Sequence, residues 1–177
     1  MISWKKYFIY QADYQHWANE ILFKSLDMLT EEARRSDQGL FFKDIHYTAD
    51  HMLVVLMNWM ARLKGETPPH GYNKVVFEDW RELKQTMRRE VRAFQRFLDD
   101  QPDYWFEGEL RYTSGGSERV MWVTDALTHI NTHFVHHRGQ LSAVATRLGA
   151  PVPEMDFVYY KREMQDHLTR IRDDEKQ

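Results

Sequence analysis

Residues 123–149 read VTDALTHINTHFVHHRGQLSAVATRLG, and this stretch decides the fold. It predicts a long helix from about Val123 to Leu148, because Gly149 supplies a C-terminal stop and Pro151 and Pro153 follow closely. Four of the nine histidines in the chain fall within nine residues of this helix: His129, His133, His136 and His137. A cluster of this density requires a chemical or a structural explanation.

The histidines at positions 133 and 137 are four residues apart, which places both side chains on one helix face, about 40° apart. A helix offers two imidazoles to one ion in this way in the HExxH zinc motif, with Nε2 ligands about 2.0–2.1 Å from the metal. Position 134 is Phe134, so the glutamate of that motif is absent. His129 extends the same stripe by one turn, whereas His136 points about 100° away from His137.

Outside this helix, apolar residues recur at helical spacing over 4–29, 44–63 and 77–98, which predicts three further long helices. Residues 30–39 form a short polar connection, and 157–172 have the pattern of a last, shorter helix.

Between Trp105 and Trp122 the period of the apolar residues changes to two, around the turn Ser114-Gly115-Gly116-Ser117. This pattern predicts a small β-hairpin. The chain is therefore expected to be one all-α domain over residues 1–177, a four-helix bundle with the hairpin inserted before the last long helix. The pattern leaves open whether the topology is up-down-up-down or includes a long crossover.

One helix cannot surround an ion, so a third protein ligand must come from another helix. His51 is the natural donor, because Val55 and Trp59 continue its stripe on a face directed to the core. His46 and Asp50 compete with it; His46 shares a face with Asp50 and is either exposed or supports the site. The competing explanation is structural, since buried histidines commonly serve as core residues with a hydrogen-bond partner.

Composition narrows the chemistry further. The 177 residues include no cysteine, which excludes disulfides, thiolate metal sites and a cysteine nucleophile, and a reducing cytoplasm is the default expectation. A net charge of -3 argues against general nucleic-acid binding. No stretch approaches the roughly 20 apolar residues of a membrane span, and the N-terminus lacks the apolar region of a signal peptide.

Four segments spread from end to end of the chain form one pattern: Tyr14-Gln15-His16-Trp17-Ala18-Asn19-Glu20, His51 with Trp59-Met60-Ala61-Arg62-Leu63-Lys64-Gly65, Asn131-Thr132-His133-Phe134-Val135-His136-His137-Arg138-Gly139-Gln140, and Asp156-Phe157-Val158-Tyr159-Tyr160-Lys161-Arg162-Glu163. Together these segments resemble the DinB-like (DinB/YfiT-type) metalloproteins. The third is close to the family's most specific motif, N-x-H-x-x-H-H-R-G-Q. Many relatives carry an acidic residue five positions after the second-helix histidine, where this chain has Leu56.

The resemblance implies a four-helix bundle, often dimeric, that holds one divalent transition metal per chain, zinc or nickel before others. It places the ligands on His51, His133 and His137, the trio that spacing favours independently. It also implies a small-molecule substrate, either a low-molecular-weight thiol for an S-transferase or the substrate of a hydrolase. If the protein is a homodimer, the aromatic residues Trp4 and Tyr7 are candidates for the contact.

Two alternatives to an enzyme remain. One is a non-catalytic or stress-response protein in which the metal is structural. The other is a DNA-damage effector that acts on nucleic acid, which the net negative charge of the chain disfavours. A structural site needs a fourth protein ligand, for which Asp50, His129 and His46 are candidates. An enzyme needs an open metal position in a pocket; the candidates to line that pocket are Tyr14, Trp17, Asn19, Arg138 and Gln140. His136 is a candidate general base.

Overall fold

The computed structural model describes residues 3–174, with the side chains described as far as Gln165. It confirms the four-helix bundle, and the long helices begin and end within a few residues of the predicted bounds. They are α1 (Trp4–Leu26), α3 (Ile45–Leu63), α4 (Trp80–Asp100) and α5 (Val123–Arg147). Side-chain caps fix three of the starts, since Ser3, Asp44 and Asp79 each accept a hydrogen bond from a backbone N–H in the first turn.

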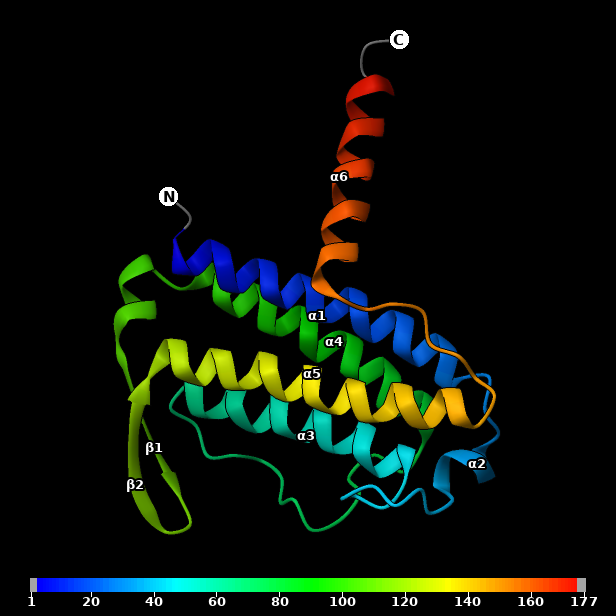
Figure 1. The fold of residues 1–177 in the computed structure, drawn as a ribbon. Coiled ribbons are helices and arrows are strands. Elements are labelled where there is room, and N and C mark those ends of the chain that lie inside the picture. The colour runs from blue at the N-terminus through cyan, green and yellow to red at the C-terminus, as the bar shows by residue number, and fades with distance from the viewer. Residues whose placement is uncertain (1–2, 175–177) are drawn as a thin grey trace.

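The helices form a ring in which α1 contacts α4 and α5, and α3 contacts the same two helices. Figure 1 shows that α1 and α5 run in one direction and that α3 and α4 run in the other. Because α3 and α4 are consecutive and parallel, residues 64–79 must return along the whole bundle, which they do as a long irregular connection (Figure 1). The bundle therefore has a long crossover rather than an up-down-up-down order.

Polar side chains of α3 hold this crossover in place. The Asp50 carboxylate accepts hydrogen bonds from the backbone N–H groups of Phe77 (2.8 Å) and Val76 (3.1 Å). His46 Nε2 donates to the Phe77 carbonyl (2.7 Å), and the Asn58 amide bonds both backbone groups of His70. An irregular segment packed on a helix needs such partners, because its buried backbone groups have no ladder of their own.

The core fills the centre of the ring with aliphatic and aromatic side chains from all four helices. Its largest fully buried members include Phe8, Leu22, Leu53, Phe94, Phe106 and Phe134. Such burial stabilises the fold by about 1.5–3 kcal/mol per large side chain.

The predicted hairpin is present as β1 (Glu109–Ser114) and β2 (Ser117–Trp122), paired antiparallel. Gly115 and Gly116 both have positive φ (60° and 75°), as a two-residue hairpin turn of this type requires. Ahead of it, residues predicted as strand form a short 3₁₀ helix, η1 (Asp103–Glu107), in which Phe106 is fully buried. The polar connection after α1 includes a short helix, α2 (Glu31–Arg35), capped by Thr30.

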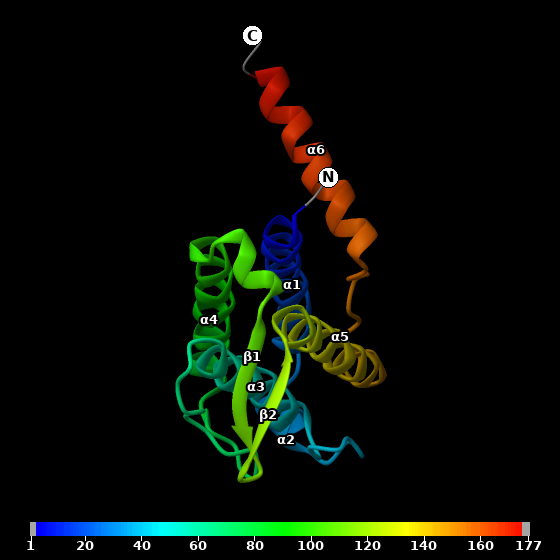
Figure 2. The same ribbon diagram turned by 90° about the vertical axis from the view of Figure 1, so that its left-hand side faces the viewer.

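The last helix, α6 (Phe157–Asp174), stands away from the bundle, as Figures 1 and 2 show from two sides. Its beginning is fastened to α1: the Tyr160 hydroxyl donates to Asp13 (2.7 Å), and the Trp17 indole N–H donates to Glu163 (2.8 Å). Along residues 3–174, every helix is too short or too polar to cross a membrane.

Candidate metal centre

Three histidine side chains from two helices converge at the seam between α3 and α5. The Nε2 atom of His133 lies 3.2 Å from His51 Nε2 and 3.2 Å from His137 Nε2, and all three ligand atoms lie within 4.8 Å of one another. Two nitrogens bound to one zinc at about 2.0–2.1 Å in tetrahedral geometry lie about 3.3 Å apart. The observed spacing therefore fits three imidazoles around one ion.

The positions of the helices explain the convergence. His133 and His137 share a face of α5, and the antiparallel neighbour α3 brings His51 opposite them. Between the two α5 histidines, Phe134 points to the other side and is fully buried in the core. That anchor fixes the rotation of α5, so the histidine face is directed at the seam.

The three side chains are in the protonation state that a metal needs. Burial, together with the charge of His137, lowers the pKa of His51 to about 4. Burial and the neighbouring imidazoles lower the pKa of His133 to about 3, and burial also lowers the pKa of His137. Neutral imidazoles are the form that binds a metal, and a shared cation would accept the Nε2 lone pairs of all three.

Gln140 orients one of the ligands. The His137 Nδ1–H donates to the amide oxygen of Gln140 (2.8 Å), which leaves the lone pair of His137 on Nε2, toward the other two rings. Of the residues predicted to line the pocket, Gln140 is the one that contacts a candidate ligand directly.

We expect Gln140→Ala to weaken zinc binding by about 10–100-fold, because such supporting bonds fix the tautomer and the ring orientation. A competition titration against a chromophoric chelator measures the affinity. Gln140→Glu keeps an acceptor in place and serves as the matched variant, which we expect to retain most of the affinity. Equal losses in both variants would show that the hydrogen bond does not orient His137.

An aromatic side chain that sequence reasoning missed packs on two of the three histidines. The Phe42 ring stacks on His51, with centroids 3.8 Å apart, and contacts His137 at 5.9 Å. The turn that presents it places Lys43 at a positive φ of 71°, a costly conformation for a residue other than glycine. Arg147 at the end of α5 holds the turn through the Gln38 side chain (2.9 Å).

The other candidate ligands lie elsewhere. His46 and Asp50 are fully buried but bond the crossover, so His46 is neither exposed nor a support for the histidine cluster. The His129 ring lies 5.6 Å from His133 and packs on Trp59, and His136 is exposed beside His137. Among the described residues, no fourth histidine or carboxylate joins the cluster of three.

The first-helix candidates for the pocket lining face away from the cluster. Arg138 is buried against α1, where it bonds the side-chain oxygens of Gln15 and Asn19. The Tyr14 hydroxyl donates to the Met155 carbonyl (2.8 Å), and Trp17 bonds α6. The prediction that Tyr14, Trp17, Asn19 and Arg138 line the metal pocket was therefore wrong. Arg138 points to the seam between α1 and α5, where Asn19 bonds it, and not to the seam between α3 and α5 that holds the histidines.

Comparison with known proteins identifies the family. Residues 6–172 match the DinB family as a whole. The chain belongs to the DinB family. One DinB relative is Protein DinB of Bacillus subtilis (strain 168), 20% identical over 155 residues that cover 84% of this chain and 90% of that protein. The fold is also that of a conserved protein from Enterococcus faecalis whose crystal structure matches with a TM-score of 0.62 at 14% identity, over 82% of this chain and 96% of that one.

One departure from the DinB pattern can now be placed in the structure. Leu56, five positions after His51, is fully buried in the core. A carboxylate at this position would need a partner or a large rise of its pKa. In this DinB protein, the side chain at position 56 therefore packs in the hydrophobic core.

Proposed function

We propose that this DinB-family protein binds one divalent metal ion per chain, zinc or nickel, through His51, His133 and His137 and uses it to activate a small molecule. The observation that carries the proposal is the convergence of three neutral Nε2 atoms with no fourth protein ligand beside them. Structural zinc sites are closed by four protein ligands, whereas catalytic sites use three and leave a position for water or substrate.

A low-molecular-weight thiol is the substrate that fits this chain best. The bound metal would supply one effect, a lower pKa for a coordinated thiol or water, which makes a nucleophile available at neutral pH. In an S-transfer, the thiol proton leaves to solvent, and the sulfur displaces a leaving group from an electrophilic carbon. A protein without cysteine cannot form disulfides with such a substrate, and the cytoplasm keeps thiols reduced.

The residues around the site support this chemistry. Phe42 covers His51 with an apolar ring and so limits the access of bulk water to the open position. Gln140 holds His137 in the tautomer that binds metal.

Cobalt-substituted protein tests the proposal. One cobalt per chain should bind, and an added thiol such as 2-mercaptoethanol should produce the sulfur-to-cobalt charge-transfer absorption that shows direct coordination. Metal that binds without any response to thiols would favour the alternative, in which the ion is structural and joins α3 to α5. No metal binding at all would overturn both.

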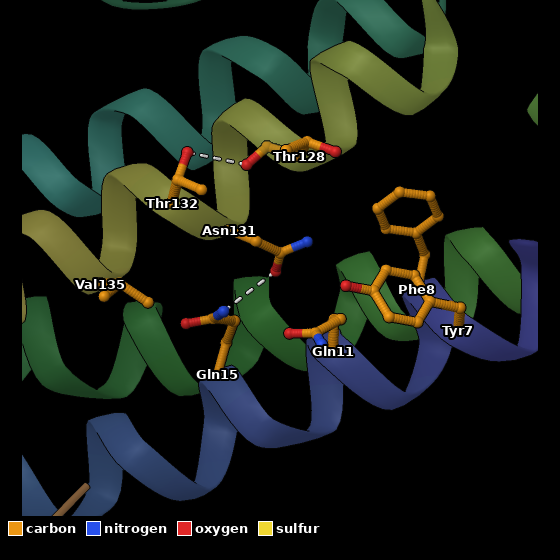
Figure 3. Close-up of a pocket in the computed structure, with 8 residues that line it drawn as sticks. All are labelled: Tyr7, Phe8, Gln11, Gln15, Thr128, Asn131, Thr132 and Val135. Carbon is orange, nitrogen blue, oxygen red and sulfur yellow. Dashed lines mark hydrogen bonds between the residues drawn. The ribbon is translucent and has the colours of Figure 1, made fainter. Parts of the chain in front are cut away.

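We also propose that the protein forms a homodimer through the groove between α1 and α5. The groove measures about 200 Å³, and its eight lining residues are all uncharged: Tyr7, Phe8, Gln11, Gln15, Thr128, Asn131, Thr132 and Val135. Figure 3 shows the Gln15–Asn131 hydrogen bond (3.0 Å) across it. Tyr7, Val135 and nearby Trp4 are about half exposed. A two-fold interface places the same surface on both partners, so a face without charge can meet itself without repulsion.

Val135→Glu should convert the dimer to a monomer in sedimentation experiments, because the two-fold axis brings the two new carboxylates together. Thr146→Glu introduces the same charge on an exposed position of α5 away from the groove and should leave the dimer intact. A wild-type protein that sediments as a monomer would overturn this part of the proposal.

A further inference from the structure

Arg62, on α3, is a cation without an ionic partner. Its guanidinium carbon lies 4.9 Å from the centre of the Trp59 ring and 5.5 Å from that of Tyr112. Among the described residues, the Arg62 side chain makes no hydrogen bond or ion pair, and its Nε is buried with no acceptor. The rings hold the guanidinium plane in a fixed place, while its N–H groups remain available.

The same groups connect Arg62 to the candidate metal centre. The ring of His129 lies 5.6 Å from that of His133 and 5.1 Å from that of Trp59, which in turn contacts Arg62. These side chains lie along the seam between α3 and α5 that also holds the three candidate ligands. Arg62 follows His51 by eleven positions on α3, so the two backbones are roughly 16 Å apart along the helix.

The charges nearby leave Arg62 unneutralised. The acidic groups of the hairpin, Glu109 and Glu118, pair with Arg111 at 2.9 and 3.6 Å. The half-buried guanidinium of Arg62 is therefore available to bind an anion at the Trp59 end of the seam.

We propose that Arg62 binds an anionic group, a carboxylate, phosphate or sulfonate, of the compound whose other end coordinates the metal. Trp59 and His129 would line the path between the two ends with flat rings. The inference rests on the proposed function, and it adds a substrate class: an elongated thiol with a negative charge roughly 10–16 Å from the sulfur. The planar fork of Arg62 suits such oxyanions because it can donate two parallel hydrogen bonds.

The test uses cobalt-loaded protein and two series of thiols. Mercaptoalkanoates of increasing chain length are titrated beside the mercaptoalkanols of the same length, and the charge-transfer absorption reports sulfur binding. We expect the acids to bind about tenfold more tightly than the alcohols, only once the chain is long enough to reach Arg62. Short pairs should bind alike.

Arg62→Met removes the charge and keeps an apolar stem on Trp59, and it should abolish the preference for long acids while the alcohols bind as before. Arg119→Met, at an exposed position of β2, serves as the control and should leave the preference intact. Equal binding of acids and alcohols at every length, or a preference that persists in Arg62→Met, would overturn the inference alone. Failure of every thiol to perturb the cobalt spectrum would overturn the proposed function as well.

Discussion

His133→Ala should reduce the affinity for zinc or nickel by more than about 100-fold. The Nε2 atom of His133 lies 3.2 Å from both of the other candidate ligands, so it occupies the middle of the set, and its loss leaves two donors on different helices. Loss of a residue that only supports a ligand costs about 10–100-fold, and loss of the ligand itself should cost more. Elemental analysis of dialysed protein and a chelator competition titration measure the change.

His136→Ala is the matched control for this experiment. It removes a histidine from the same turns of α5, but the side chain is exposed and its Nε2 is not part of the cluster of three. We expect one metal per chain and wild-type affinity in this variant. Equal loss of metal from both variants would mean that the ion binds on the outer face of α5 rather than in the seam.

As the pH falls, the free energy of unfolding of metal-free His133→Ala should decrease less than that of the metal-free wild-type protein. The pKa of His133 is about 3 in the folded chain and near 6.5 when the chain is unfolded, so the unfolded state takes up a proton first. That difference lowers the stability of the wild-type protein as the pH falls from about 6.5 toward 3, and it is absent when position 133 is alanine.

The long helices could be predicted from the sequence because each buries one apolar face, and α3, α4 and α5 kept their predicted extent to within a few residues. The start of α4 shows the limit of such reasoning. The prediction began at Phe77, but its backbone N–H bonds Asp50, and the helix starts only after the Asp79 cap. Asp50, distant in sequence, holds Phe77 outside the helix, whereas the local start signal is the N-cap Asp79 with Glu82 three residues on, which the apolar spacing outweighed.

The second-helix ligand could be chosen from spacing because His51 faces a different direction from His46 and Asp50 on the same helix. His46 and Asp50 share a face that meets the crossover, whereas His51 lies one position on and faces α5. The topology that makes α3 and α5 neighbours was left open by the pattern. Phe42 could not be foreseen, because it lies in an irregular turn whose path depends on contacts with α5.

Phe134→Ala should lower the free energy of unfolding by about 3–5 kcal/mol, as expected for a fully buried aromatic side chain. For a chain of this length, each 1 kcal/mol corresponds to about 2–4 °C in Tm, so calorimetry of metal-free protein should show a fall of roughly 10 °C. Thr146→Ala, at an exposed position of α5, is the control, and its effect should remain within about 0.5 kcal/mol.

The same substitution shows whether the core and the metal centre depend on each other. Phe134 lies between His133 and His137 in the sequence and fixes the rotation of α5, so a cavity in its place lets the histidine face turn and should weaken zinc binding as well. Saturating zinc stabilises any form that still binds it, by about 2.7 kcal/mol at 100 times Kd. Zinc should therefore raise the Tm of Phe134→Ala by less than it raises that of the wild-type protein. Equal increases would show that the site is held by α3 and α5 independently of this core residue.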